Sequence, residues 1–438
     1  MKTRFLYLWE SLNSSFWFLP LFIILLGIGA AAGLVYLDTM EFYTPLGQVS
    51  YLLGGGYESA RSVLSVIAGA MLGVAGTVFS ITLVALTLAS SQFGSRLLRN
   101  FMYDSLNQVV LGVYVATFLY CIIVLRTVKS INEAEFVPNL SVLFALLLAV
   151  SNIILLIVFI HHISVSIQAD HVIADVDEKL EKSLIKLFPE ELGEEDPNKD
   201  HKELWNTLKG KLTEKTSVSS DYKGYLQAVD NDGLMELAKQ YDLLLEIRFR
   251  PGEFLVADME IASVYSKNAI EGKVIKKLCG AFILGKVRTP TQDAEFAIHQ
   301  LVEIAARALS PGINDPYTAI TCVDRLCASM CYLTKAHFPS AYRYDDNEQL
   351  RIVAKPVDFA GMMDAAFNQI RQFGKGSPAV LIRLMEVLVI INGFARGKAQ
   401  KDTVLRHAQM VLNTAEEAFT EKNDLGDMKE RFQSMQKV

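Results

Sequence analysis

The polar side chains best placed for chemistry lie on one long uncharged segment. Small and hydroxyl-bearing residues recur at helical spacing from residue 63 to 89, and no charged residue stands between Arg61 and Arg96. Small residues let helices approach closely in lipid, whereas hydroxyls can supply the polar partners that water or an ion needs at membrane depth. Both interpretations stay open for the candidate pore-lining residues, which are Ser65, Gly69, Gly73, Thr77, Ser80 and Thr87.

Two arginines and three histidines stand near the apolar segments. Arg96 and Arg99 would form a basic ring at the cytoplasmic mouth of an oligomer, or they are ordinary positive-inside anchors. His161, His162 and His171 are weak candidates for metal ligands, since no cluster of Cys or His accompanies them. Interfacial or capping histidines are the simpler interpretation, so we expect no metal and no other cofactor.

The run RALSPGINDPYTAI holds a third candidate site. Arg307, Asn314 and Asp315 would place a guanidinium, an amide and a carboxylate around a Pro-Gly turn, where they could bind a small polar ligand. Alternatively, Asp315 caps the helix that Pro316 begins, and Asn314 closes the turn. In that case Arg307 pairs with Glu303 four residues earlier.

No catalytic signature accompanies these residues. Cys322, Cys327 and Cys331 share a predicted helix but lack the Cys-x-x-Cys pairs of a zinc site, so we expect core thiols. The sequence has no phosphate-cradling glycine loop, no Gly-x-Ser-x-Gly elbow and no His-Glu-x-x-His. This lowers the expectation of an enzyme and leaves the question open.

The composition divides the chain into two parts. Of its 438 residues 51% are hydrophobic, and mean hydropathy is +0.27. Residues 1–165 hold seven acidic and seven basic residues, so the net charge of −6 lies entirely in residues 166–438. The apolar content excludes disorder, and five scattered cysteines exclude a disulfide scaffold. Residues 166–438 carry a net negative charge and show no stripe of basic residues, which argues against nucleic-acid binding.

Four apolar stretches are candidates to span a membrane, which takes about 20 residues in a helix. They contain no Asp, Glu, Lys or Arg, which argues against a pump or carrier with buried carboxylates. An even number of spans puts both termini on one side of the membrane. The loop charges and the unpaired cysteines favour the cytoplasm as that side. We expect a multi-pass protein of a bacterial inner membrane with spans at Phe16–Leu37, Val63–Ala89, Val109–Leu125 and Leu140–Ile160.

The pattern predicts a membrane α-helical fold of four transmembrane helices with a cytosolic α+β domain. Residues 1–165 form the four-span domain. Residues 166–220 form a helical extension and a charged linker, and the extension continues the fourth span to near Pro189. Residues 221–290 form a small β-rich module, and residues 291–438 a helical cytosolic domain. Strands around the Pro251-Gly252 turn favour a barrel-like form for this insertion in a mostly helical domain.

Three phrases carry a resemblance to a known family: SITLVALTLASSQFGSRLLRNF, FIHHISVSIQ and RALSPGINDPYTAI. They resemble a bacterial family of predicted integral membrane proteins, numbered 2254 among the domains of unknown function. The resemblance covers nearly the whole chain, and the Ser-Pro-Gly-Ile-Asn-Asp-Pro run is very specific. It implies an inner-membrane protein with an intracellular C-terminal domain, and it implies no particular reaction.

These observations favour a homo-oligomeric channel for an ion or small solute, with membrane lipid around it and a cytosolic domain for assembly or gating. The alternative is a membrane-anchored sensor or scaffold without a pore, whose cytosolic domain binds a ligand or a protein. A weaker third hypothesis is an enzyme acting on lipid, for which only His161 and His162 are candidates.

Overall fold

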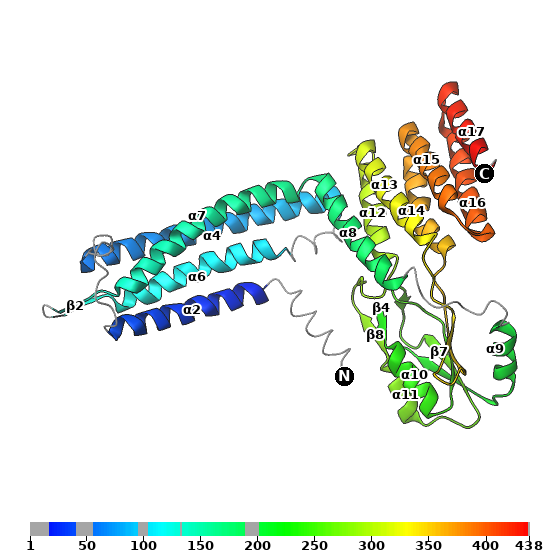
Figure 1. Cartoon of the computed structure of the whole chain (residues 1–438), viewed down its shortest axis with the longest axis horizontal. Coiled ribbons are helices and arrows are strands. Elements are labelled where there is room, and N and C mark those ends of the chain that lie inside the picture. Colours follow the sequence, from blue (N-terminus) through cyan, green and yellow to red (C-terminus); the bar gives the residue numbers. More distant parts are fainter. Residues whose placement is uncertain (1–16, 41–55, 95–103, 132–133, 189–200, 437–438) are drawn as a thin grey trace. The chain divides into compact units, whose positions relative to one another are not determined.

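The computed structural model describes residues 17–40, 56–94, 104–131, 134–188 and 201–436. The chain divides into two compact units (Figure 1). We call Met1–His171 the apolar unit and Val172–Val438 the C-terminal unit.

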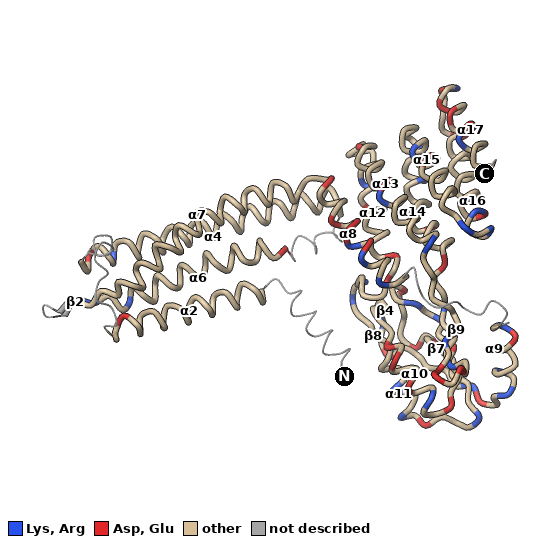
Figure 2. The backbone as a smooth tube through the Cα atoms, viewed as in Figure 1, with Lys and Arg blue, Asp and Glu red and all other residues tan. Residues whose placement is uncertain are grey.

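The apolar unit consists mainly of long helices whose charged residues lie near the helix ends (Figure 2). Four helices in the described residues are long and apolar enough to cross a membrane, which confirms the four predicted candidates. They are α2 (Phe18–Thr39), α4 (Tyr57–Phe93), α6 (Ser105–Thr127) and α7 (Asn139–Ser166). A short antiparallel pair, β1 (Lys129–Ile131) and β2 (Ala134–Phe136), connects α6 to α7.

Helix α6 packs against each of the other three. Glycines allow its close approach to α2: a Cβ built on Gly112 would lie 3.0 Å from the Cα of Pro20, and one on Gly27 3.0 Å from the Cβ of Ala116. The hydroxyls of Tyr114 and Tyr120 donate hydrogen bonds to backbone carbonyls of α7 at 2.7 and 2.9 Å. Helix α6 therefore forms the core of the apolar unit.

Asp38, at the end of α2, caps helix α7. Its carboxylate oxygens accept hydrogen bonds from the backbone N–H groups of Leu140 and Ser141, both at 3.0 Å. The Ser141 hydroxyl donates to the same carboxylate at 2.6 Å. Because these N–H groups have no partner within the helix, the contact joins two helices about a hundred residues apart in sequence.

Helix α7 ends at Ser166, and a separate helix, α8 (Ala169–Leu187), follows after two residues. The predicted single helix from the fourth span to near Pro189 is therefore wrong. Ser164 and Ser166 donate their hydroxyls to the carbonyls four residues earlier, and the Gln168 amide donates to the Ser164 carbonyl. Such side-chain bonds compete with the helical backbone pattern and favour its end here.

The C-terminal unit begins with α8, α9 (His201–Gly210) and a β-rich part. Its elements are β3 (Glu214–Ser219), β4 (Gly224–Val229), α10 (Asn231–Gln240), β5 (Leu244–Ile247), β6 (Phe254–Leu255), β7 (Glu260–Ser266), α11 (Gly272–Cys279), β8 (Phe282–Gly285), β9 (Tyr342–Tyr344) and β10 (Leu350–Ala354). Helix α9 and strand β3 lie where the sequence analysis expected a charged linker.

The described strands of the C-terminal unit form two sheets, and neither closes into the expected barrel. One sheet has the order β3-β7-β5-β10-β9 and the other the order β6-β4-β8. The sequence predicted strands around the Pro251-Gly252 turn, but a local pattern does not give the partners of a strand. Strand β10 pairs in parallel with β5, about a hundred residues away, and brings β9 into the sheet.

The remaining helices lie in residues 291–438, where the sequence predicted a helical domain. They are α12 (Phe296–Ala308), α13 (Pro316–Leu333), α14 (Phe359–Phe373), the short 3-10 turn η1 (Gly374–Gly376), α15 (Pro378–Phe394), α16 (Lys398–Ala418) and α17 (Lys422–Gln436). Helix α15 is central, because it packs against α13, α16 and α17. The α13 residue Tyr332 donates its hydroxyl to the Phe188 carbonyl at 2.8 Å, which attaches the end of α8 to this bundle.

Candidate functional site

The small and hydroxylated face of α4 points away from the other helices of the apolar unit. The opposite side of α4 is buried, with Leu64, Met71 and Val78 among its contacts with the core. All six candidate pore-lining residues are exposed within the unit: Ser65, Gly69, Gly73, Thr77, Ser80 and Thr87. Gly76, which the sequence analysis did not select, lies on the same exposed face.

The space in front of this face is empty within the unit. A Cβ built on Gly69, Gly73 or Gly76 would meet no atom within 4 Å. Bulky side chains are exposed on α4 too, among them Leu72, Leu83 and Val84, but they alternate with glycines. The exposed face of α7 holds no glycine and carries bulky side chains such as Ile153, Ile154 and Ile157. Bulky residues suit a surface against lipid tails, whereas small residues suit a close helix contact.

The two threonine hydroxyls of this face already donate hydrogen bonds within the helix. Thr77 donates to the Gly73 carbonyl at 3.1 Å, and Thr87 donates to the Leu83 carbonyl at 2.9 Å. Each oxygen still has lone pairs that can accept a hydrogen bond or contact a cation. Arg96 and Arg99, the predicted cytoplasmic mouth, lie outside the described residues.

The three candidate histidines do not form a metal centre. The described residues contain no group of three or more Asp, Glu, His or Cys side chains that could hold a metal ion. His161 and His171 are exposed. His162 contacts Asp104 through Nε2 at 2.5 Å, and Asp104 also caps α6 by accepting from the Leu106 N–H. His162 thus connects the end of α7 to the start of α6.

In the Pro-Gly turn the side chains take the structural roles weighed above. Asp315 caps α13 by accepting from the N–H and the hydroxyl of Thr318, at 3.1 and 2.6 Å. Asn314 is exposed and has a φ of +51°, in the left-handed region. Arg307 lies 3.7 Å from Glu303. Ligand binding by Arg307, Asn314 and Asp315 stays a prediction.

A pocket in the C-terminal unit lies where two parallel strands end. Because β5 and β10 pair in parallel, with Ile247 opposite Ala354, the residues that follow both strands share one edge of the sheet. Such edges commonly bind ligands in sheets with parallel strands. The pocket has a volume of about 200 Å³, and its apolar wall includes Phe188, Phe249 and Val357.

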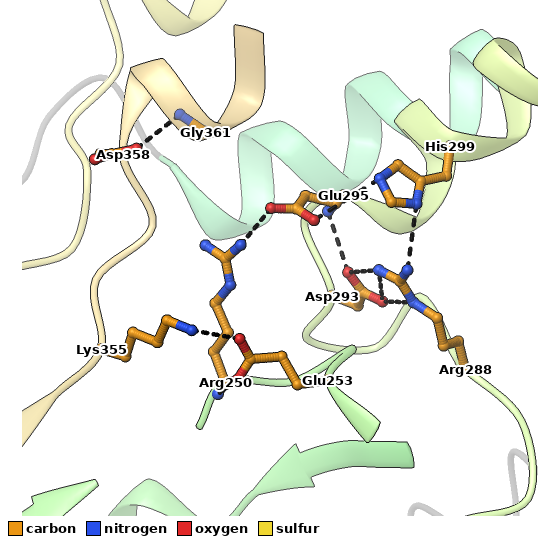
Figure 3. A network of polar contacts seen from close by, with 9 residues as sticks. All are labelled: Arg250, Glu253, Arg288, Asp293, Glu295, His299, Lys355, Asp358 and Gly361. Carbon is orange, nitrogen blue, oxygen red and sulfur yellow. Dashed lines mark hydrogen bonds and ion pairs between the residues drawn. The ribbon is translucent and has the colours of Figure 1, made fainter. Parts of the chain in front are cut away.

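Three basic side chains line this pocket, and no acidic residue is among its described lining residues. Arg250 Nη2 contacts Glu295 at 2.5 Å, and Lys355 Nζ contacts Glu253 at 2.5 Å (Figure 3). The third, Arg343, donates to the amide oxygen of Asn231 at 2.5 Å.

A buried ion pair supports the wall beside Arg250. Arg288 donates two hydrogen bonds to the Asp293 carboxylate, at 2.7 and 2.9 Å (Figure 3). Burial raises the pKa of Asp293, while the charge of Arg288 opposes that rise. Gly252 has a φ of +97°, and a Cβ there would lie 2.5 Å from Asp293 Oδ2. Glycine is therefore required where the Pro-Gly turn passes this carboxylate.

The comparisons place the chain among known sequences. The model of a family described as predicted membrane protein (DUF2254) matches residues 13–389. The chain belongs to this family. The DUF2254 match covers all four apolar helices and extends into α15.

Two mycobacterial proteins are similar to the chain over most of its length. They are the uncharacterized protein Mb1321c of Mycobacterium bovis and the uncharacterized protein Rv1290c of Mycobacterium tuberculosis. Each is 31% identical over 422 residues, which cover 95% of this chain and 79% of the relative. No solved structure matches the chain. The DUF2254 assignment identifies a predicted membrane protein, and the two relatives add no activity.

The pocket could not be predicted from the sequence, because its residues are far apart in the chain. Arg250, Lys355 and Arg343 stand in no common motif, and their neighbourhood depends on the parallel pairing of β5 with β10. The available signal was weak: the Pro251-Gly252 turn was recognised, but Arg250 before it was not.

Proposed function

We propose that this chain self-associates in the membrane through the outward face of α4, and that the assembled faces form a passive path for ions or small solutes. The observation that carries the proposal is the outward position of Gly69, Gly73 and Thr77, on a helix whose other side is buried in the apolar unit. A face of this kind favours contact with another helix over contact with lipid.

The chemistry of the face supports a passive path. The α4 segment from Ser62 to Phe93 contains no ionisable Asp, Glu, Lys or Arg, so it offers no carboxylate for proton coupling. Its hydroxyl oxygens remain acceptors, which suits water or a cation more than an anion. In this proposal the chain lies in a bacterial inner membrane, with both termini and the C-terminal unit in the cytoplasm.

The test is ion flux through liposomes that contain the purified full chain. We expect potassium efflux above that of empty liposomes, and we expect Gly73→Leu to change its rate. Gly29→Leu is the matched control, since Gly29 is an exposed glycine of α2 with no atom within 4 Å of a built Cβ. Liposomes that stay impermeable under voltage and membrane tension would count against conduction.

A second candidate function is a membrane-anchored ligand-binding sensor or scaffold without a pore. The pocket at the ends of β5 and β10 favours it, because three basic side chains converge there on an apolar wall. Silent liposomes together with ligand binding at this pocket would favour the sensor over the channel.

A further inference from the structure

One positive charge in the pocket has no anion to balance it. Arg250 and Lys355 are each paired with a glutamate. Within the described part of the chain, Arg343 has no carboxylate partner within 4.0 Å, and its side chain donates a hydrogen bond to the neutral amide of Asn231. A guanidinium keeps its charge in a protein, so this arrangement leaves one net positive charge at the pocket.

The charge of Arg343 lies in surroundings that stabilise it poorly. Burial lowers the pKa of Arg343, and no carboxylate interaction opposes this shift. A cation removed from water needs a partner, and an unpaired one reduces stability. A bound anion would supply the missing partner, and its affinity would include the relief of this penalty.

The fold positions Arg343 for such a partner. Arg343 lies on β9, paired with Ile352 of β10 in the antiparallel register, beside the strand end that carries Lys355. The Asn231 amide oxygen accepts from one nitrogen of the guanidinium, Nη1. The group has further N–H donors in a planar fork, which matches the two oxygens of a carboxylate.

The pocket also limits the size and polarity of the ligand. Its volume of about 200 Å³ is below the range of about 300–1,000 Å³ that holds drug-sized ligands. Phe249, Pro251 and Val357 offer apolar surface to the rest of the molecule. One uncompensated charge suits a monoanion better than a phosphate dianion.

We infer that the pocket at the ends of β5 and β10 binds a small organic monocarboxylate, with its carboxylate on Arg343 and its apolar body against Phe249 and Val357. This binding site is independent of the proposed conduction path.

The test is equilibrium dialysis of radiolabelled benzoate against the full chain in a non-ionic detergent. We expect saturable binding with one site per chain. Arg343→Gln should weaken it at least about tenfold, since hydrogen bonds between charged groups are the strong ones. Arg396→Gln is the matched control, because it removes one exposed positive charge from the same unit, and it should leave binding unchanged.

Three competitors and two further variants separate the alternatives. Unlabelled benzoate should displace the label, whereas inorganic phosphate and the neutral benzyl alcohol should not. Arg343→Lys keeps the charge without the fork and should bind with intermediate affinity. Val357→Trp keeps Arg343 but fills the pocket, so it should abolish binding in a chain with an unchanged melting temperature. This variant provides the test if Arg343→Gln does not fold.

The assignment is overturned by any of three results. The first is no saturable benzoate binding by the wild-type chain. The second is equal loss of binding in Arg396→Gln and Arg343→Gln, which would indicate a general charge effect. The third is tighter binding of phosphate than of benzoate.

Discussion

Replacing Gly73 by leucine should separate the stability of the apolar unit from its self-association. A built Cβ on Gly73 meets no atom within 4 Å, so the position borders open space in the isolated unit. Glycine is a poor helix former, and its replacement by leucine favours the helix by up to about 1 kcal/mol. We therefore expect an unchanged or slightly raised melting temperature for the monomer.

Self-association should change in the opposite direction. A leucine on this face separates two helices that small residues would allow to touch. We expect the dissociation constant to rise at least about tenfold, which corresponds to about 1.4 kcal/mol. The assay is Förster transfer between donor- and acceptor-labelled chains in lipid vesicles, followed as the chains are diluted with lipid.

Two other glycines serve as controls for this variant. Gly29→Leu also fills open space, but on α2, so the melting temperature should again be unchanged or slightly raised, and energy transfer should stay the same. Gly112→Leu should destabilise the unit, because even a Cβ at this position lies 3.0 Å from Pro20 Cα. The reasoning is refuted if Gly73→Leu lowers the melting temperature as Gly112→Leu does, or if it leaves energy transfer unchanged.

Three further changes test the fold. Asp38→Ala removes the cap of α7 and should cost about 1–2 kcal/mol in thermal unfolding. Gly252→Ala should destabilise by more than about 1 kcal/mol, because of its φ of +97° and the Asp293 carboxylate. Gly397→Ala, in open space at the N-cap of α16, should cost less. Burial lowers the pKa of His407 to about 4, so the unfolded chain binds a proton that the folded chain does not. Stability should fall as pH drops from about 6.5 towards 4, and His407→Gln should reduce this loss.

The helices could be predicted from the sequence because their signals are local. Long apolar runs predicted the four helices of the apolar unit, and Asp315 before Pro316 predicted the start of α13. Ser377 before Pro378 has the same pattern and begins α15. In each case the residues that determine the element lie within one or two turns of it.

The features that were predicted wrongly or not at all depend mostly on contacts that no local sequence pattern reveals. The barrel-like form was expected from the strands around the Pro251-Gly252 turn, but one partner of β5 is β10, which the chain reaches only after α12 and α13. The break after Ser166 depends on side-chain bonds that an apolar pattern does not reveal. To predict the Arg343 pocket, one must know the order of the strands in the sheet and that no carboxylate lies beside Arg343. Neither can be inferred from a single segment of the sequence.

Disulfide cross-linking in native membranes tests the central claim most directly. Cysteine replaces Gly69 or Gly76 on the outward face of α4, and in parallel Ile154 or Ile157 on the exposed face of α7. Mild oxidation should yield covalent dimers from both α4 variants, above the background of the chain with only its native cysteines, and little from the α7 variants. Equal dimer yields at all four positions, or none on α4, would contradict self-association through this face.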